Sequence, residues 1–266
     1  MLVAGIDIGS RTTKTLLLED GATRGQSMIY TGPDSAAAAR AGFEEALKMA
    51  GGDWGDVGYI VATGYGRIIV PFAQESITEI ACHARGVHSL FPSARTVLDM
   101  GGQDCKAIRV NAEGNHTNFA MNEKCAAGTG RFLEVMAEVL NVPLSEIGPL
   151  SLTSQEEVKV SSTCTVFAKS EVSYLVRRGV KKSDILAALH EAISVRVYSL
   201  LKQVGIEKEF VITGGIARNI GVVRRVADKV GLTPLVPPDP QMMGALGAAL
   251  FARESAKRSQ ARPLAG

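Results

Sequence analysis

The sequence predicts an α/β protein made of two lobes of similar plan with a cleft between them. Two segments share one pattern: an apolar strand that ends in aspartate, a glycine turn, and a second strand rich in β-forming residues. They are LVAGIDIGSRTTKTLLL at the start of the chain and ARTVLDMGGQDCKAIRV from position 94. Each is followed by helical segments, and this mixture of strands and helices is typical of α/β folds.

The other elements follow from residue type and periodicity. We expect helices over 35–50, 76–90, 130–140, 166–178, 183–204, 221–230 and 242–257, a short strand from 60 running into a glycine-rich loop that ends at 67, and a buried strand over 210–213. Ser183 is the predicted N-cap of the long helix, and 234–240 is a proline-rich connector. The first lobe is expected to comprise 1–94 and the C-terminal helix at about 242–266, and the second lobe 95–241.

Composition narrows the functional classes. The chain has 266 residues, of which 46% are apolar, so it can bury a substantial core. Lys plus Arg number 29 and Asp plus Glu number 27, and aromatic residues are few, which argues against nucleic-acid binding. The start of the chain lacks the pattern of a signal peptide, and no apolar run is long enough to cross a membrane. We therefore expect a cytoplasmic protein.

Three glycine turns, each directly after an apolar strand, predict a nucleotide site. One such turn is ordinary in α/β proteins, but three in this order favour phosphate and adenosine binding, because glycine lets backbone amides approach a ligand. Asp7 and Asp99 at the strand ends are expected to hold Mg²⁺ through its waters, and with Gln103 they are the predicted catalytic residues. The predicted nucleotide contacts are Gly9, Ser10, Arg11, Thr12, Thr13 and Lys14 in the first turn, Gly101, Gly102 and Gln103 in the second, and Gly214, Gly215, Ala217 and Asn219 in the third.

Neither the GxxxxGK[ST] pattern nor a GxGxxG that opens a helix occurs in the chain. The order of the three turns instead resembles the superfamily of sugar kinases, acetate kinase, actin and the heat-shock chaperone ATPases. This resemblance implies an actin-like, sugar-kinase-like ATPase fold of two ribonuclease-H-like lobes with the nucleotide in the cleft. In that superfamily two hairpins clamp the phosphates and the later Gly-Gly turn takes the adenosine.

Two of the four cysteines have surroundings that suit a metal centre. Cys125 lies in MNEKCAAGTGRFL and Cys164 in SSTCTVFA, each just before a predicted helix. The positive end of a helix dipole favours a thiolate. Two thiolates cannot complete the Cys₄ shell of a [4Fe–4S] cluster, but a twofold axis would supply the other pair. From physics alone, simple burial of both cysteines is favoured, and a shared zinc is a lesser alternative. Burial is the better interpretation of Cys82 and Cys105.

The sequence also resembles the activator proteins of 2-hydroxyacyl-CoA dehydratases, an ATPase family that includes the ATP-binding subunits of benzoyl-CoA reductase. The resemblance extends almost end to end and is carried by GIDIGSRTTK, ATGYGR, LDMGGQD, MNEKCAAGTGRFLEVMA, SSTCTVFAKSEV, TGGIARN and GALGAAL. The blocks around Cys125 and Cys164 are highly specific, since the kinases and chaperones of the superfamily lack them.

The resemblance implies an oxygen-sensitive homodimer in which Cys125 and Cys164 of both subunits hold one [4Fe–4S] cluster. Reduced by ferredoxin or flavodoxin, such a protein uses ATP, which it converts to ADP, to pass one electron to a partner iron–sulfur dehydratase or reductase. Gln241 and Ala245 would lie near the adenine. Two residues depart from the family pattern: Arg11 replaces a small residue, and Lys169 replaces a glutamate near the presumed docking face. A reductase with a double-cubane cluster is therefore a further candidate partner.

We expect ATP to close the lobes and to pivot the helices that follow Cys125 and Cys164. Two rival functions remain on the same fold. One is a sugar-type kinase without a cluster, in which Asp99 is the general base for a hydroxyl group. The other is a chaperone-like or regulatory ATPase without a metal.

Overall fold

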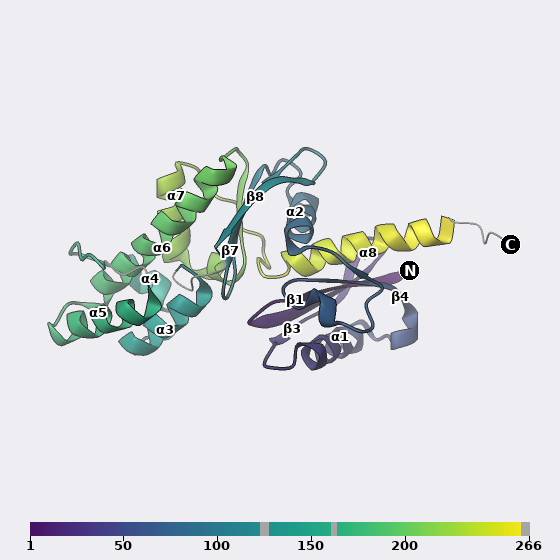
Figure 1. The fold of residues 1–266 in the computed structure, drawn as a ribbon, viewed down its shortest axis with the longest axis horizontal. Helices are drawn as coiled ribbons and strands as arrows, with labels where there is room; N and C mark the ends of the chain where they lie inside the picture. Colours follow the sequence, from purple (N-terminus) through teal and green to yellow (C-terminus); the bar gives the residue numbers. More distant parts are fainter. Residues whose placement is uncertain (123–127, 161–163, 262–266) are drawn as a thin grey trace. The chain divides into compact units, whose positions relative to one another are not determined.

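The structure is a computed structural model that describes residues 1–122, 128–160 and 164–261. The chain divides into two compact units (Figure 1). The first comprises Met1–Pro92, Glu113–His116 and Gln241–Gly266, and the second comprises Ser93–Ala112 and Thr117–Pro240. Each unit contains one mixed sheet with helices packed on it, and the predicted α/β class is confirmed.

The first sheet has five strands in the order β3-β2-β1-β4-β5. These are β1 (Leu2–Ile8), β2 (Thr12–Glu19), β3 (Ala22–Tyr30), β4 (Val57–Thr63) and β5 (Glu75–Ser76). The central strand β1 runs antiparallel to β2 and parallel to β4. The helices of this unit are α1 (Ser35–Ala50), α2 (Glu79–Leu90) and α8 (Met243–Ala261), with short 3₁₀ turns η1 (Trp54–Asp56) and η2 (Arg67–Ile69).

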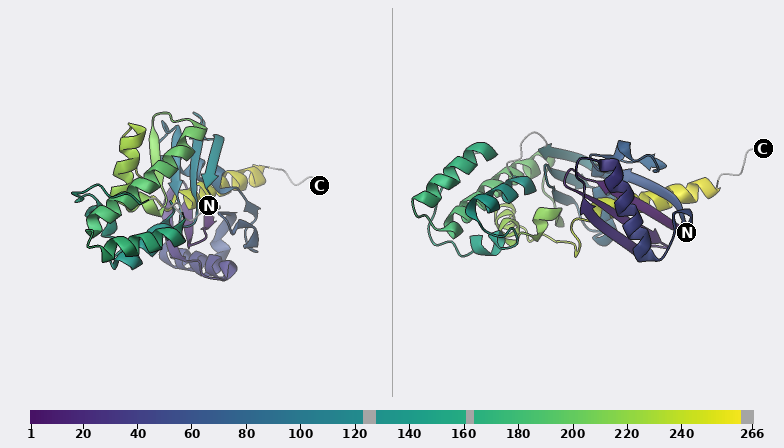
Figure 2. Two further views of the ribbon diagram at one scale, coloured as in Figure 1. Left: turned by 60° about the vertical axis from the view of Figure 1, so that its left-hand side comes forward. Right: turned by 90° about the horizontal axis from the view of Figure 1, so that it is seen from below.

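Every residue of β1 is buried because helices cover both faces of the sheet. Ala4 and Ile6 pack with Phe43 of α1 in one core. On the opposite face Gly5 meets the backbone of α8, and α2 packs against α8. Figure 2 shows α1 and α8 on the two sides of this sheet.

The second sheet has the order β8-β7-β6-β9. Its strands are β6 (Thr96–Met100), β7 (Cys105–Val110), β8 (His116–Asn122) and β9 (Phe210–Thr213). The helices are α3 (Gly130–Leu140), α4 (Ile147–Ser151), α5 (Thr165–Arg177), α6 (Lys182–Val204) and α7 (Ile220–Val230), and the 3₁₀ turn η3 covers Gly215–Arg218. The core lies between β6, β7 and these helices and includes Leu98, Phe132, Met136 and Leu189.

The two sheets have one plan. In each, the central strand pairs antiparallel with the next strand in the chain and parallel with a strand that follows a helical crossover. Beyond β9, Leu235 forms a single parallel bridge with Val211, at the position that β5 takes beside β4. The duplicated motif predicted from the sequence therefore extends to whole sheets.

All seven predicted helices are present, and five of them start one to three residues away from the predicted position. The helices predicted from 166 and 242 begin at Thr165 and Met243. The helix predicted from 76 begins at Glu79, capped by Thr78, because Glu75 and Ser76 pair with β4 as a short strand. The long helix α6 begins at Lys182, so Ser183 is not its N-cap. The helix predicted over 221–230 begins one residue earlier, at Ile220.

Within the ranges that the structure describes, no helix is long and apolar enough to cross a membrane.

Candidate functional site

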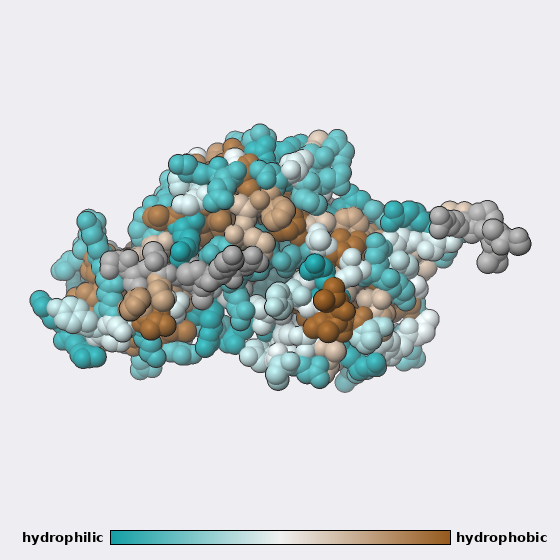
Figure 3. Space-filling model, viewed as in Figure 1, coloured by the Kyte–Doolittle hydropathy of each residue, from teal (hydrophilic) through white to brown (hydrophobic). Residues whose placement is uncertain are grey.

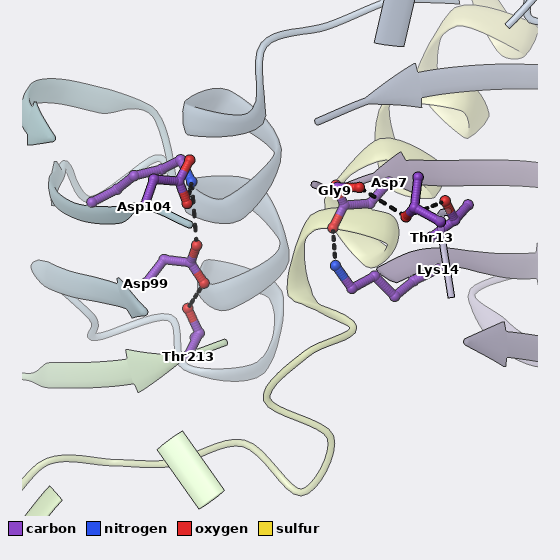
Figure 4. A network of polar contacts seen from close by, with 9 residues as sticks. Asp7, Gly9, Thr13, Lys14, Asp99, Asp104 and Thr213 are labelled. Carbon is purple, nitrogen blue, oxygen red and sulfur yellow. Dashed lines mark hydrogen bonds and ion pairs between the residues drawn. The ribbon is translucent and has the colours of Figure 1, made fainter. Parts of the chain in front are cut away.

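The first glycine turn connects β1 to β2 and places a carboxylate beside a lysine. Asp7 of β1 lies opposite Lys14 of β2 across the antiparallel ladder. Lys14 Nζ is 3.3 Å from Asp7 Oδ2, and both side chains are largely buried (Figure 4). A carboxylate with so little access to water needs a counter-charge, because an unpaired buried charge is costly. Two predicted site residues are thus brought together.

Two threonines support this turn from the protein interior. Thr31 Oγ1 donates to the Gly9 carbonyl at 2.8 Å, and it lies 3.0 Å from Thr13 Oγ1. Because a hydroxyl has one proton to donate, Thr13 is the donor to Thr31. Thr13 is fully buried, so its hydroxyl supports the turn, and the sequence did not single out Thr31.

The tip of the turn carries the other predicted phosphate contacts. Gly9 N donates to the Thr12 carbonyl at 3.1 Å, which closes the turn, and Ser10 is exposed at its tip. The Arg11 guanidinium lies 5.1 Å from the Tyr30 ring centroid and donates to the Tyr30 hydroxyl at 3.2 Å. The residue that departs from the family pattern is thus held against an aromatic side chain of β3.

The second glycine turn connects β6 to β7 and has a denser charge network. Asp99 Oδ1 accepts a hydrogen bond of 2.8 Å from Thr213 Oγ1, while Lys106 Nζ lies 3.7 Å from Asp99 Oδ2 (Figure 4). Lys106 Nζ also lies 2.8 Å from Asp104 Oδ1. The Lys106 side chain is only 3% exposed, so this ammonium needs its carboxylates inside the fold.

The predicted contacts in this turn differ in exposure. Gly101 and Gly102 are half-buried, and Gln103 is exposed at the tip. Gly101 N donates to the Asp104 carbonyl at 2.9 Å and closes the turn.

Lys106 and Thr213 were not among the predicted site residues, although a signal for Lys106 exists. Lys14 follows Asp7 by seven positions, and Lys106 follows Asp99 by the same number. Both lysines lie opposite their aspartate on the antiparallel neighbour. Comparing the two segments residue by residue would have identified the second lysine.

The parallel neighbour contributes a repeated Thr-Gly pair. Thr63 lies opposite Asp7, and Thr213 opposite Asp99. The glycine after each threonine has positive φ, +86° at Gly64 and +83° at Gly214. A Cβ on Gly64 would lie 2.5 Å from Asp7 Oδ1, and one on Gly214 would overlap the Met100 backbone. Both positions need glycine because of this conformation and this contact.

The third turn follows β9, and its last residue caps a helix. Asn219 Oδ1 accepts from Gly221 N at 3.0 Å and from Val222 N at 3.2 Å, at the start of α7. The Asn219 amide also lies 2.9 Å from His190 Nε2, while His190 Nδ1 lies 2.7 Å from the Leu186 carbonyl. Burial lowers the pKa of His190 to about 4, so the ring is neutral at pH 7. The Asn219 side chain, a predicted nucleotide contact, is therefore hydrogen-bonded to His190 and to the start of α7.

The remaining predicted nucleotide contacts lie in both units. Gly215 is exposed in the third turn, and Ala217 is buried in η3. Gln241 and Ala245 belong to the first unit, where Ala245 is fully buried beneath the Gly5 segment of β1. Contact of Gln241 and Ala245 with adenine stays a prediction.

The cysteines differ sharply in their surroundings. Cys164 is the N-cap residue of α5, as predicted. It is exposed, so the interpretation of Cys164 as a buried apolar side chain is wrong. Cys125 lies outside the described residues. Cys82 and Cys105 are buried, as expected. Burial raises the pKa of Cys82 to about 12 and raises that of Cys105 still further. Both buried thiols therefore remain protonated and are poor metal ligands.

The described part of the chain places no three His, Cys, Asp or Glu side chains together as a metal site. Cys164 fits a thiolate ligand by its exposure and by its place at the start of a 13-residue helix. Asp7 and Asp99 each have a lysine beside one carboxylate oxygen. This arrangement suits contact with a hydrated Mg²⁺ through water better than direct coordination.

Known proteins resemble the chain over nearly its whole length. The 2-hydroxyisocaproyl-CoA dehydratase activator of Clostridioides difficile is 43% identical over 264 residues, which cover 98% of each chain. The structure of the corresponding Clostridium difficile activator with bound ADPNP superimposes with a TM-score of 0.93 at 42% identity and covers all of both chains. Component A of the (R)-2-hydroxyglutaryl-CoA dehydratase of Acidaminococcus fermentans gives 0.92 at 41% identity, covering 97% of this chain and 99% of that one.

More distant structures show the fold alone. A glucokinase of the ROK family from Streptomyces griseus has a TM-score of 0.58 at 14% identity, covering 96% of this chain and all of that one. The predicted sugar-kinase-like ATPase fold is thereby confirmed. The sequence profile of one ATPase family matches residues 4–252, which confirms the resemblance found from the motifs. The chain belongs to the BadF/BadG/BcrA/BcrD ATPase family.

Proposed function

We propose that this chain is an ATP-hydrolysing activator that delivers one electron at a time to a partner iron–sulfur enzyme, with a 2-hydroxyacyl-CoA dehydratase as the first candidate. The observation that carries the proposal is the exposed Cys164 at the N-terminus of α5 in a chain so similar to dehydratase activators. The predicted site residues of both phosphate turns support ATP as the energy source.

The number of cysteines that could bind a cluster supports a dimer. Cys82 and Cys105 are buried and protonated, so one chain can offer only Cys125 and Cys164 as thiolates. A [4Fe–4S] cluster needs four. In an isologous dimer each of these residues occurs twice around the axis, which completes the set. When bound, such a cluster would accept one electron from ferredoxin or flavodoxin and donate it at low potential.

The protein's own contribution at Cys164 is electrostatic. The first turn of α5 leaves backbone N–H groups without partners in the helix, and the helix dipole places partial positive charge there. Both stabilise a thiolate and the negative charge of a thiolate-bound centre. The second and third residues of α5 are apolar and exposed: Val166 is 71% exposed and Phe167 is 70% exposed.

At the nucleotide, each turn would supply a carboxylate and backbone amides. Lys14 and Lys106 fix the orientation of Asp7 and Asp99, and these carboxylates would hold waters of a bound Mg²⁺. Gln103, exposed at the tip of the second turn, would orient the water that attacks the γ-phosphate. Backbone amides of the glycine turns would bind the phosphate oxygens.

The surface around Cys164 bears on the partner. Lys169 is exposed on α5, at a position where the resemblance leads us to expect glutamate. Separately, Figure 3 shows apolar patches on the face of the molecule that it draws. A reversed charge at the rim of an interface changes partner choice more than affinity. A benzoyl-CoA reductase-like or double-cubane reductase therefore stays a candidate partner alongside a dehydratase.

Anaerobic purification followed by iron and sulfide analysis tests the proposal. We expect about four irons per dimer, ATP hydrolysis, and a brown colour that air bleaches. Cys164→Ser should lose the iron but keep nucleotide binding, with Cys82→Ser as a matched control that keeps both. An iron-free, air-stable wild-type protein that phosphorylates a sugar would refute the proposal and support the kinase alternative.

A further inference from the structure

The start of α3 is hydrogen-bonded directly to the second phosphate turn. Gly130 N donates to the Gly101 carbonyl at 2.9 Å, and Arg131 N donates to the Gly102 carbonyl at 2.8 Å. These are N–H groups of the first helical turn, which have no acceptor inside the helix. The phosphate turn therefore caps α3, and a shift of its peptide groups acts on that helix.

A third contact joins the same two segments through a side chain. Cys105 follows the phosphate turn as the first residue of β7, and its Sγ donates to the Gly128 carbonyl at 3.2 Å. Cys105 is 1% exposed. Burial, reinforced by the charges of Asp99 and Asp104, raises its pKa, so the thiol keeps the proton that it donates.

Glycine at position 130 keeps this contact short. A Cβ on Gly130 would lie 3.2 Å from the Gly101 carbonyl oxygen and 3.3 Å from the Gly102 Cα, which is tighter than ordinary van der Waals contact. An alanine there would require the start of α3 and the phosphate turn to move apart by a few tenths of an ångström. The backbone φ of Gly128 is +98°, so the neighbouring acceptor residue also favours glycine.

From this arrangement we propose that Cys105 and Gly130 are positioning residues that couple the second phosphate turn to the chain segment carrying Cys125. The inference rests on the proposed function, since it concerns regulation of the same centre. Cys125 precedes Gly128 by three residues in the sequence. Movement of the phosphate turn on phosphate binding passes to residues 128–131 through the hydrogen bonds of Gly101 and Gly102 and through that of the adjoining Cys105.

Helix α3 can transmit this movement because it is anchored along its length. Phe132, Leu133 and Met136 are buried in the core of the second unit, so the helix responds as a rigid body. It packs against α5, whose N-cap is Cys164. One helix thus joins the phosphate turn to both cysteine-bearing segments.

The experiment uses the anaerobic dimer and three variants. Cys105→Ala removes the thiol donor, Cys105→Ser keeps a donor, and Gly130→Ala crowds the contact between the two backbones. Cys82→Ala is the matched control, because it also removes a fully buried thiol but lies in the first unit. For each protein we would measure ADP affinity in the oxidised and reduced states, the EPR spectrum of the reduced cluster with and without ADPNP, and hydrogen exchange of 128–131.

The ratio of the two ADP affinities measures coupling. Cys105→Ala and Gly130→Ala should each reduce it roughly five-fold, the effect of about one hydrogen bond, with ADP affinity in the oxidised state kept within about three-fold. ADPNP should slow exchange of 128–131 in the wild type, in Cys105→Ser and in Cys82→Ala, but not in Cys105→Ala.

Unchanged coupling and exchange in both Cys105→Ala and Gly130→Ala would overturn the inference, as would an equal loss of nucleotide binding in both redox states. A wild-type protein without iron would refute the proposed function instead. In that case hydrogen exchange would still test the link between the phosphate turn and residues 128–131.

Discussion

Replacement of Lys106 by methionine removes an ammonium group from the interior of the second unit while keeping a side chain of similar length. Lys106 Nζ lies 2.8 Å from Asp104 Oδ1 and 3.7 Å from Asp99 Oδ2, and the lysine side chain is 3% exposed. Without it, Asp99 and Asp104 lose the ammonium group that lies beside both carboxylates. Breaking a buried ion pair on one side costs about 3–5 kcal/mol.

We expect Lys106→Met to lower the free energy of unfolding by about 3 kcal/mol, the lower end of this range. The reason is that the Asp104 side chain is 25% exposed and can recruit water. Denaturant unfolding at pH 7 measures this difference. Combining Lys106→Met with Asp104→Asn should cost less than the sum of the single changes, because the two residues are in contact.

The matched control is Lys14→Met, which removes the equivalent lysine of the first unit. Lys14 is 13% exposed and is 3.3 Å from Asp7, so its replacement should cost less. Loss of less than about 1 kcal/mol in Lys106→Met, the value of an exposed ion pair, would show that the buried network does not stabilise the turn.

Three further predictions test the support of the third turn. The pKa of His190 is about 4 in the folded protein against 6.5 ordinarily. Between these pH values the unfolded chain binds a proton that the folded protein does not, so the free energy of unfolding should fall by up to about 3 kcal/mol from pH 6.5 to 4. His190→Gln should remove this pH dependence, as measured by thermal unfolding. Asn219→Ala should cost about 1 kcal/mol for the lost cap, and more if the neutral His190 is left without its partner, as measured by urea unfolding. Gly214→Ala should destabilise by at least about 3 kcal/mol, because the Cβ overlaps Met100 as well as straining the backbone. Gly231→Ala, with φ of +73° and open space around it, should show only the strain; equal losses in the two glycine variants would contradict the overlap.

The sequence predicts the strands and turns of the site well because each turn is encoded locally. An apolar strand, an aspartate and a glycine are consecutive residues, and Asp7 and Asp99 lie at strand ends as expected. The first residue of a helix is predicted less accurately, because it depends on contacts with residues that are distant in the sequence. Ser76, the first residue of the predicted helix, instead pairs with β4 together with Glu75, an interaction that helix propensity does not include.

Side-chain partners on neighbouring strands are harder to predict from the sequence than the turns are. Thr213 is 114 positions from Asp99, and its hydroxyl donates to that carboxylate only because β9 lies parallel to β6 in register. No local pattern indicates that register. The duplication does, however: once β4 is expected beside β1, the second Thr-Gly pair predicts the same placement of β9 beside β6.

The cysteines show why residue type alone does not decide function. Cys105 and Cys164 are each the residue at the beginning of a regular element, and the sequence separates them only through neighbouring motifs. In the fold one thiol is buried among carboxylates and donates to Gly128, whereas the other is exposed at a helix N-terminus. The same group is thus a neutral hydrogen-bond donor in one place and accessible to a ligand in the other. Protonation follows from burial and nearby charge, and so from the fold that brings the two segments together.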